Sequence, residues 1–199
     1  SPLPAIDNNT VSMDLMVADM EKIRKKLQLK QWTIIGHSFG GMLAAHYASQ
    51  HPAQVEKLVF SSSGGLDLQF RDQIAERLLN NLSLQEQIRM QMYQLRQRSG
   101  DDSVSTRDKL AQLRANAYVI DKTKASLIAA RLKVVNMTIN SLVFADLDSL
   151  HFDLKQQFKT FEAPVLVLQG EKDIISVDTA KSIAGSFSNA RLVLMPNCA

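Results

Sequence analysis

Ser38 lies between two glycines, Gly36 and Gly40, in the stretch TIIGHSFGG at positions 33–41. An apolar β-branched run precedes the serine and a helical pattern follows it, so the G-x-S-x-G spacing predicts a strained strand-to-helix turn that exposes the hydroxyl. Both flanking positions are expected to need glycine, because a Cβ atom there would collide with the neighbouring strand or helix. The backbone N–H of Phe39, at the helix start, is a predicted oxyanion donor. The pattern predicts a nucleophilic serine, and the alternative is an ordinary glycine-rich turn.

Short apolar strands alternate with helices around this turn. Strands are predicted at 32–36, 55–63, 163–170 and 190–196, and helices at 10–29, 40–52 and 176–187. The apolar face of the first helix is expected to contain Leu15, Met20, Ile23 and Leu27. Near-continuous apolar strands that alternate with helices indicate the α/β class, with a mostly parallel sheet covered by helices on both faces.

A long helical interval interrupts this alternation from about residue 66 to residue 160. Ser83 and Glu86 have the spacing of a helix capping box, and Gly100 is a predicted helix stop. Further helical patterns lie at 110–120 and 125–135. The predicted domains are a first core part with the elbow, a helical lid and a second core part with the acid-bearing strand: 1–65, 66–160 and 161–199.

Composition excludes several classes of function. The chain has 199 residues, of which 45% are hydrophobic, and no apolar run approaches the ~20 residues that a membrane span requires. Residues 71–133 carry a net charge of +5 within a total of +3, but Tyr93 and Tyr118 are their only aromatic residues. Scattered basic residues without interleaved aromatics indicate solvated helix faces, so a nucleic-acid partner is disfavoured. Cys198 is the single cysteine, which excludes an internal disulfide and a cysteine metal cluster.

Three stretches of the sequence resemble the α/β-hydrolase family: GHSFGG at 36–41, HPAQVEKLVFSSSGG at 51–65 and PVLVLQGEKD at 164–173. The resemblance covers nearly the whole chain. LVFSSSGG and the size of the lid resemble, more narrowly, the proline-iminopeptidase-like serine peptidases. The resemblance implies a Ser38 nucleophile and no metal or organic cofactor. Haloalkane and epoxide hydrolases are disfavoured, because those relatives carry aspartate at the position of Ser38.

The triad acid of this family follows the serine and precedes the histidine along the chain. The resemblance implies Asp173, which stands in the turn after the strand at 163–170. Its position agrees, because open α/β sheets gather their site residues at the carboxyl ends of the strands. Asp67, just beyond the strand at 55–63, is the alternative acid. Asp178 is expected to be a turn or helix-capping aspartate.

The base is harder to assign, because the chain has only four histidines: His37, His46, His51 and His151. His37 is expected to point away from the direction of attack and to have a packing role. His46 and His51 belong to the helix after the elbow and to its end, and His151 is expected to be a partly exposed helix residue. All four precede Asp173. The resemblance implies that the catalytic histidine lies beyond Ala199.

The resemblance also implies that the chain is an excerpt of a longer hydrolase. SPLP at positions 1–4 resembles the tail of the loop after the family's fourth strand. Earlier strands, and a His-Gly or Gly-Gly-Pro loop with the second oxyanion N–H, would then precede Ser1. We expect the 199 residues alone to be inactive and poorly folded. Esterase turnover comparable to that of a complete hydrolase would contradict this expectation.

Three functions remain open: an aminopeptidase of proline-iminopeptidase type, a carboxylesterase or other small-molecule ester or amide hydrolase, and a non-catalytic binding protein on the same fold. The first two take a peptide or small-molecule substrate. An aminopeptidase must hold a free N-terminal ammonium group, and the acidic candidates for this role are Glu76, Glu86, Asp146 and Asp148. The run RMQMYQL at 89–95 either lines an adaptable apolar pocket or forms the core of the lid.

Overall fold

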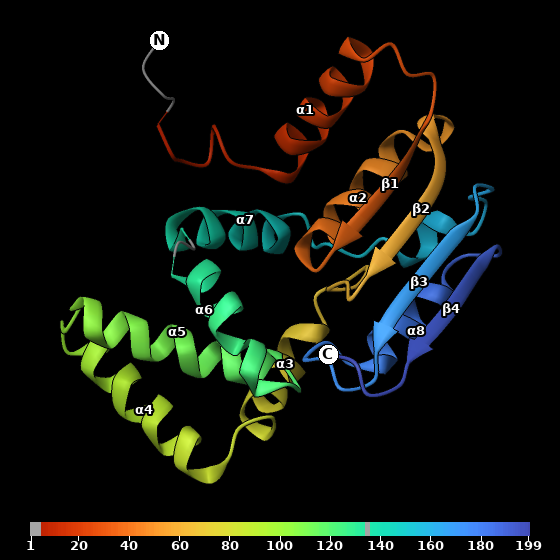
Figure 1. Ribbon diagram of the computed structural model, residues 1–199. Coiled ribbons are helices and arrows are strands. Elements are labelled where there is room, and N and C mark those ends of the chain that lie inside the picture. The colour runs from red at the N-terminus through yellow and green to blue at the C-terminus, as the bar shows by residue number, and fades with distance from the viewer. Residues whose placement is uncertain (1–4, 134–135) are drawn as a thin grey trace.

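The computed structural model describes residues 5–133 and 136–199. The described strands pair in parallel in the order β1-β2-β3-β4 (Figure 1). The strands are β1 (Trp32–His37), β2 (Val55–Ser61), β3 (Val165–Gly170) and β4 (Ala190–Met195). The helices are α1 (Met13–Lys26), α2 (Phe39–Gln50), α3 (Phe70–Asn80), α4 (Leu84–Arg98), α5 (Val104–Tyr118), α6 (Ala125–Leu132), α7 (Met137–Ser149) and α8 (Val177–Gly185). Short 3-10 helices occupy Pro52–Gln54, Lys122–Lys124 and Lys155–Phe158. The predicted α/β class and the order of core elements are confirmed.

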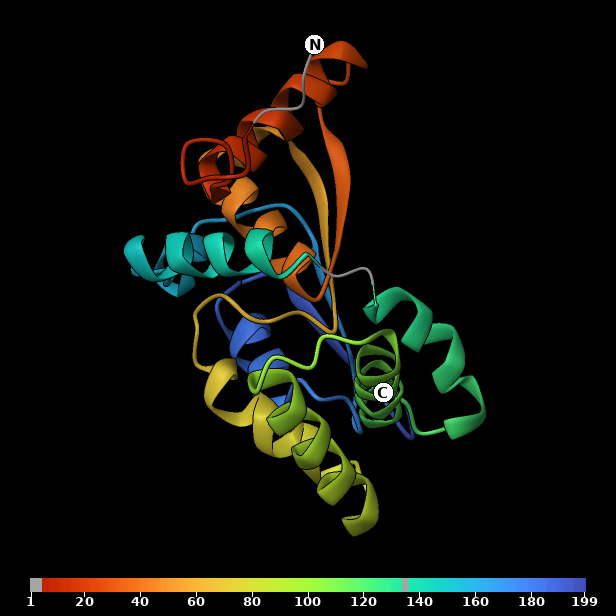
Figure 2. The ribbon, with the colours of Figure 1, turned by 90° about the vertical axis from the view of Figure 1, so that its left-hand side faces the viewer.

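The core helices α1, α2 and α8 lie on the same face of the sheet (Figure 2). Ile34, Leu58 and Val165 are neighbours in the strand register and are buried on this face. Ile35 points to the opposite face and is 71% exposed. Within the described ranges, the core helices therefore cover one face of the sheet. The apolar character of the strands instead predicted that helices would cover both faces.

The buried face of α1 differs from the predicted one. The helix buries Met13, Val17 and Arg24, whereas Leu15, Ile23 and Leu27 are exposed and Met20 is only half-buried. The buried face also contains an arginine, which a count of apolar residues overlooks. Arg24 Nη2 lies 2.7 Å from Glu21 Oε1, and its Nη1 donates to the carbonyls beyond the helix end. Arg24 can be buried because these partners satisfy its guanidinium group.

The interval between β2 and β3 is helical, as predicted. Ser83 and Glu86 form the reciprocal capping box of α4, and Gly100 follows this helix with a φ of +94°. The pattern at 125–135 forms α6, and residues 134–135 lie outside the described residues, as does the stretch 1–4.

Among the described residues, no single helix has the length and apolar character to cross a membrane. Lys122–Leu132 and Met137–Ser149 meet these two criteria only together, as a pair bent by 87°.

The helical interval contributes to more than one hydrophobic cluster. One cluster lies within α4, α5 and the segment before α4 and contains Leu82, Met90, Leu110, Leu113 and Ala117. By contrast, Val143 and Leu147 of α7 belong to the cluster that also contains Met13 and Val17 of α1. The N–H of Met13 donates to Asp146 Oδ2 of α7 at 2.7 Å. Helix α7 therefore packs on the core, and the domain boundaries at 65 and 160 stay a prediction.

Candidate active site

Ser38 stands between the end of β1 and the start of α2, with φ 54° and ψ −123°. A positive φ is uncommon for a residue with a Cβ atom and stores backbone strain. The N–H of Ser38 donates to the carbonyls of Ser61 and Ser62 at 3.2 and 3.1 Å, and its own carbonyl accepts the N–H of Gly41 at 3.0 Å. These bonds hold the turn while the side chain remains exposed. The predicted strand and helix around Ser38 are confirmed.

The glycines of the motif do not all have the same role. A Cβ atom on Gly36 would lie 2.4 Å from the carbonyl oxygen of Gly40, so this position requires glycine. A Cβ atom on Gly40 would meet nothing within 4 Å, so the prediction that Gly40 avoids a collision is wrong. The tight position is Gly41, where a Cβ atom would lie 2.2 Å from Ser63 Oγ. The requirement for glycine at position 41 therefore comes from Ser63 in the loop after β2, which is distant from the elbow in the sequence.

Phe39 is the first residue of α2. The N–H groups of a first helical turn have no acceptor within their own helix, and the helix dipole places partial positive charge there. The N–H of Phe39 follows Ser38 directly, and the Phe39 side chain packs against the main core. This location suits an oxyanion donor, and the role of Phe39 stays a prediction.

Asp173 lies three residues beyond the end of β3 and is 8% exposed. Its Oδ1 accepts the N–H of Ile175 at 2.9 Å, and its N–H donates to the carbonyl of Gly170 at 3.3 Å. The helical interval between β2 and β3 supplies a further contact, because Arg77 of α3 donates from Nη2 and Nε to the carbonyl of Asp173 at 2.7 and 3.2 Å. Sequence reasoning missed Arg77, since an arginine within a helix of a basic interval gives no signal of such a contact.

Ser38 and Asp173 leave the same edge of the sheet. His37 pairs in register with Ser61, and Ser61 pairs with Leu168, so the carboxyl ends of β1, β2 and β3 are aligned. Open parallel sheets bind their ligands at this edge. The nucleophile and acid candidates are thus placed on one side of the fold, as the sequence predicted.

Tyr118, the last residue of α5, lies near the acid candidate. Burial raises the pKa of its phenol, the positive charge of Arg114 opposes this effect, and the negative charge of Asp173 adds to it. The phenol therefore keeps its proton at neutral pH and can donate a hydrogen bond near Asp173. The sequence indicated no role for Tyr118 in the site.

The alternative acid, Asp67, is engaged elsewhere. Its Oδ2 lies 2.6 Å from Lys155 Nζ, and its Oδ1 accepts the N–H of Gln69 at 3.0 Å. The hydrogen bond to Asp67 raises the pKa of the Lys155 ammonium group. Because both carboxylate oxygens have partners, Asp67 is less available than Asp173 to orient a base.

The expected turn or capping role of Asp178 is wrong, because the residue lies within α8. The N-cap of α8 is Ser176, whose side chain accepts the N–H of Thr179. Asp178 lies in the first turn, where it is exposed and pairs with Lys181 at 3.2 Å. A carboxylate in this position still interacts favourably with the helix dipole.

Two of the histidines are held by structural contacts. His46 of α2 is buried, and its Nε2 lies 2.8 Å from Asp14 Oδ1. This hydrogen bond lowers the pKa of the Asp14 carboxyl. His51 forms the C-cap of α2, and its ring centroid lies 5.0 Å from that of Tyr47. Both histidines occupy the predicted places on α2.

The other two histidines differ from expectation. His37 is exposed at the end of β1, so its expected packing role is wrong. His151 lies after the C-cap of α7 with a φ of +47°, and this left-handed conformation places it in a turn instead of a helix. Among the hydrogen bonds of the described residues, none joins a histidine to Ser38 or Asp173.

The acidic side chains considered for ammonium binding mostly have structural partners. The partners are Ser83 and Asn116 for Glu86, the N–H of Met13 for Asp146, and Arg71 for Asp148. Glu76 is exposed on α3. In the part of the chain that the structure describes, no group of three or more His, Cys, Asp or Glu side chains could hold a metal ion.

Comparison with known proteins agrees with this geometry. A family model described as alpha/beta hydrolase fold matches residues 1–199. Proline iminopeptidase from Lactobacillus delbrueckii subsp. bulgaricus is 25% identical over 194 residues, which cover 92% of this chain and 63% of the relative. The chain therefore spans less than two thirds of that relative's length.

Solved structures give the same result for the fold. An alpha/beta fold family hydrolase from Bacillus anthracis has a TM-score of 0.73 at 21% identity, over 98% of this chain and 69% of that one. A proline iminopeptidase from Mycobacterium smegmatis has a TM-score of 0.69 at 17% identity, over 100% of this chain and 68% of that one. The resemblance to proline-iminopeptidase-like proteins is confirmed. Because the family model matches the whole chain, this protein belongs to the α/β-hydrolase fold family.

Proposed function

We propose that this protein is a serine hydrolase that transfers an acyl group to water through Ser38. The observation that carries the proposal is the backbone of Ser38, strained at φ 54° and ψ −123° between β1 and α2. Such strain persists only where the surrounding structure enforces it, and it is concentrated at functional sites. An ordinary glycine-rich turn would place a glycine, and not a serine, at the positive φ.

The proposed reaction uses the residues at the carboxyl edge of the sheet. Ser38 Oγ attacks the substrate carbonyl carbon, and a histidine, expected beyond Ala199, takes the hydroxyl proton. Asp173 orients that histidine, and the N–H of Phe39 donates to the tetrahedral oxyanion. The leaving group departs with the proton, and water then hydrolyses the acyl-serine by the same steps.

The first substrate candidate is a peptide with a free N-terminus, in particular an N-terminal proline. This choice rests on the similarity to proline iminopeptidases, which covers 92% of the chain at 25% identity. The second candidate is a small-molecule ester. It is favoured by the engagement of Glu86, Asp146 and Asp148 in structural contacts, which leaves Glu76 alone among the acidic residues considered for binding an ammonium group.

The test compares a prolyl anilide with short-chain nitrophenyl esters, using the protein expressed at the full length of its coding sequence. Ser38→Ala should lower kcat on the accepted substrate by at least about 10⁴-fold, since the nucleophile is lost. Asp173→Asn should lower kcat strongly, whereas Asp67→Asn should leave more activity. The opposite order would assign the acid to Asp67.

The coding sequence on both sides of the chain tests the base. A histidine shortly after Ala199 supports the triad. Its absence, together with no turnover of either substrate class, would favour a non-catalytic binding protein on this fold. Hydrolysis that survives Ser38→Ala unchanged would refute the proposed nucleophile.

A further inference from the structure

Helix α4 has two apolar faces, and only one of them is used for packing inside the lid. Met90 is 5% exposed in the cluster that α4 shares with α5, and Tyr93 packs against the same cluster. The run at 89–95 therefore contributes to the lid core, which is one of its two predicted roles. The remaining apolar residues of α4 need a separate explanation.

The second apolar face forms a continuous stripe, called here the α4 stripe. Its residues are Leu84, Ile88, Met92 and Leu95, which are 72%, 58%, 41% and 62% exposed. At about 100° per residue, these positions fall within roughly 80° of the helix circumference and extend about 16 Å along it. They lie on the side of the helix away from Met90. The stripe thus points outward from the lid.

Arginines border the α4 stripe on both sides. On the helical wheel, Arg89 and Arg96 follow one border of the stripe, and Arg98 lies at the other. All three are exposed, and in the described part of the chain none of them forms an ion pair with a carboxylate. The acidic residue of the helix, Glu86, faces inward, where it accepts hydrogen bonds from Ser83 and Asn116.

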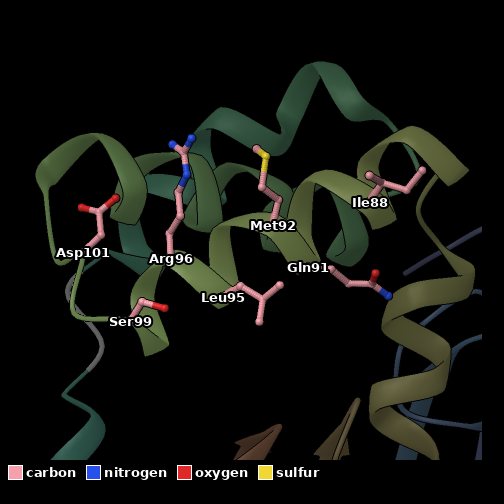
Figure 3. A pocket seen from close by; sticks show the side chains of 7 residues that line it. All are labelled: Ile88, Gln91, Met92, Leu95, Arg96, Ser99 and Asp101. Carbon is pink, nitrogen blue, oxygen red and sulfur yellow. The ribbon is translucent and has the colours of Figure 1, made fainter.

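The surroundings of α4 leave this face accessible. The helix lies at the end of the lid that is remote from the sheet (Figure 1). Figure 3 looks onto the face, with Met92 and Arg96 extending to one side and Leu95 and Gln91 to the other. The side chains border an open groove of about 560 Å³, which also includes Asp101 at the helix end.

We propose that the α4 stripe is a docking surface for an anionic phospholipid surface. An apolar stripe bordered by arginines is the pattern of a helix that lies in the plane of a membrane interface, with its apolar side chains among the acyl chains and its cations at the phosphates. A second copy of the chain is the poorer occupant. Two α4 stripes placed face to face would bring the arginines of both copies together, and like charges repel.

The test is cosedimentation of the whole protein with vesicles of phosphatidylcholine that contain phosphatidylserine, and with vesicles of phosphatidylcholine alone. Binding should need phosphatidylserine and should weaken with added salt. Ile88→Gln with Leu95→Gln should lower the partition coefficient by at least about tenfold, since two apolar side chains that would enter the acyl-chain region become polar. Arg89→Gln and Arg98→Gln should each lower it about fivefold.

The matched control is Leu127→Gln. Leu127 is 71% exposed on α6, which lies across α5 from α4 (Figure 2), so this variant removes an exposed leucine without touching the α4 stripe. It should leave vesicle binding unchanged, and circular dichroism should show that all variants remain folded. The proposal is overturned by absence of binding, by equal binding to both kinds of vesicle, or by an equal loss in the control. A dimer that dissociates with the stripe variants in the absence of lipid would assign the face to a second copy and would also overturn it.

Discussion

Gly36→Ala should destabilise the protein and Gly40→Ala should not, although the motif treats the two glycines as equivalent. In Gly36→Ala the new Cβ atom would lie 2.4 to 2.6 Å from three backbone atoms of Gly40 and Gly41. Backbone cannot rotate aside as a side chain can, so we expect a loss near the upper end of the ~1–3 kcal/mol typical of overpacking. In Gly40→Ala the Cβ atom meets nothing within 4 Å, and alanine in a helix is favoured over glycine by up to about 1 kcal/mol.

Thermal unfolding followed by circular dichroism measures the difference. For a chain of this length, about 1 kcal/mol corresponds to roughly 2–4 °C in Tm. Gly36→Ala should therefore lower Tm by about 6–12 °C, and Gly40→Ala should leave it unchanged or raise it by up to about 4 °C. Equal destabilisation by the two substitutions would refute the conclusion that only Gly36 is sterically restricted.

Gly41 offers a second check on the same reasoning. In Gly41→Ala the new Cβ atom would lie 2.2 Å from Ser63 Oγ and 2.6 Å from Ser63 Cβ, so the obstacle is one side chain. Gly41→Ala should be destabilising alone, and Ser63→Gly should restore part of the loss by removing both atoms. A double-mutant cycle gives the interaction directly. Additive effects of the two substitutions would mean that the clash with Ser63 is not the cause.

Two further predictions concern hydrogen-bonded groups. Arg77→Ala removes both donors to the carbonyl of Asp173, so kcat should fall about tenfold with less change in KM. The amide of Ile175, which donates to Asp173, should also exchange its hydrogen faster. Arg77→Lys should restore part of the loss in kcat, and unchanged exchange at Ile175 in Arg77→Ala would contradict a positioning role for Arg77. The hydrogen bond from Arg24 lowers the pKa of Glu21 from 4.5 to about 2, so the stability it confers is present above pH 4.5 and is lost as the pH falls toward 2. The Tm difference between Glu21→Gln and the wild type should therefore shrink over this range, and a constant difference would refute the linkage.

The sequence predicted the parts of the fold that repeat a simple pattern. The strand at 32–36 and the helix at 40–52 differ from β1 and α2 by no more than a few residues at their ends. The capping box at Ser83 and Glu86 also formed as predicted, since its partners are three residues apart and the interaction is local.

The sequence failed where a charged side chain is buried or makes a specific contact, whether local or distant in the chain. The buried face of α1 includes Arg24, whose guanidinium group is satisfied by Glu21 and by carbonyls beyond the helix end. Arg77 meets Asp173 across 96 positions of the chain. Hydrophobic periodicity carries no information about either contact, because it treats a charged residue as exposed by default.

The stretches GHSFGG and LVFSSSGG, which carry the family resemblance separately in the sequence, form one unit in the structure. The carbonyls of Ser61 and Ser62 accept the N–H of Ser38, and Ser63 fills the space that a side chain on Gly41 would need. A strained residue costs about 1–3 kcal/mol, so a serine at φ 54° needs such support from outside its own turn. The loop after β2 is therefore part of the elbow, and a larger side chain at Ser63 should disturb the turn around Ser38.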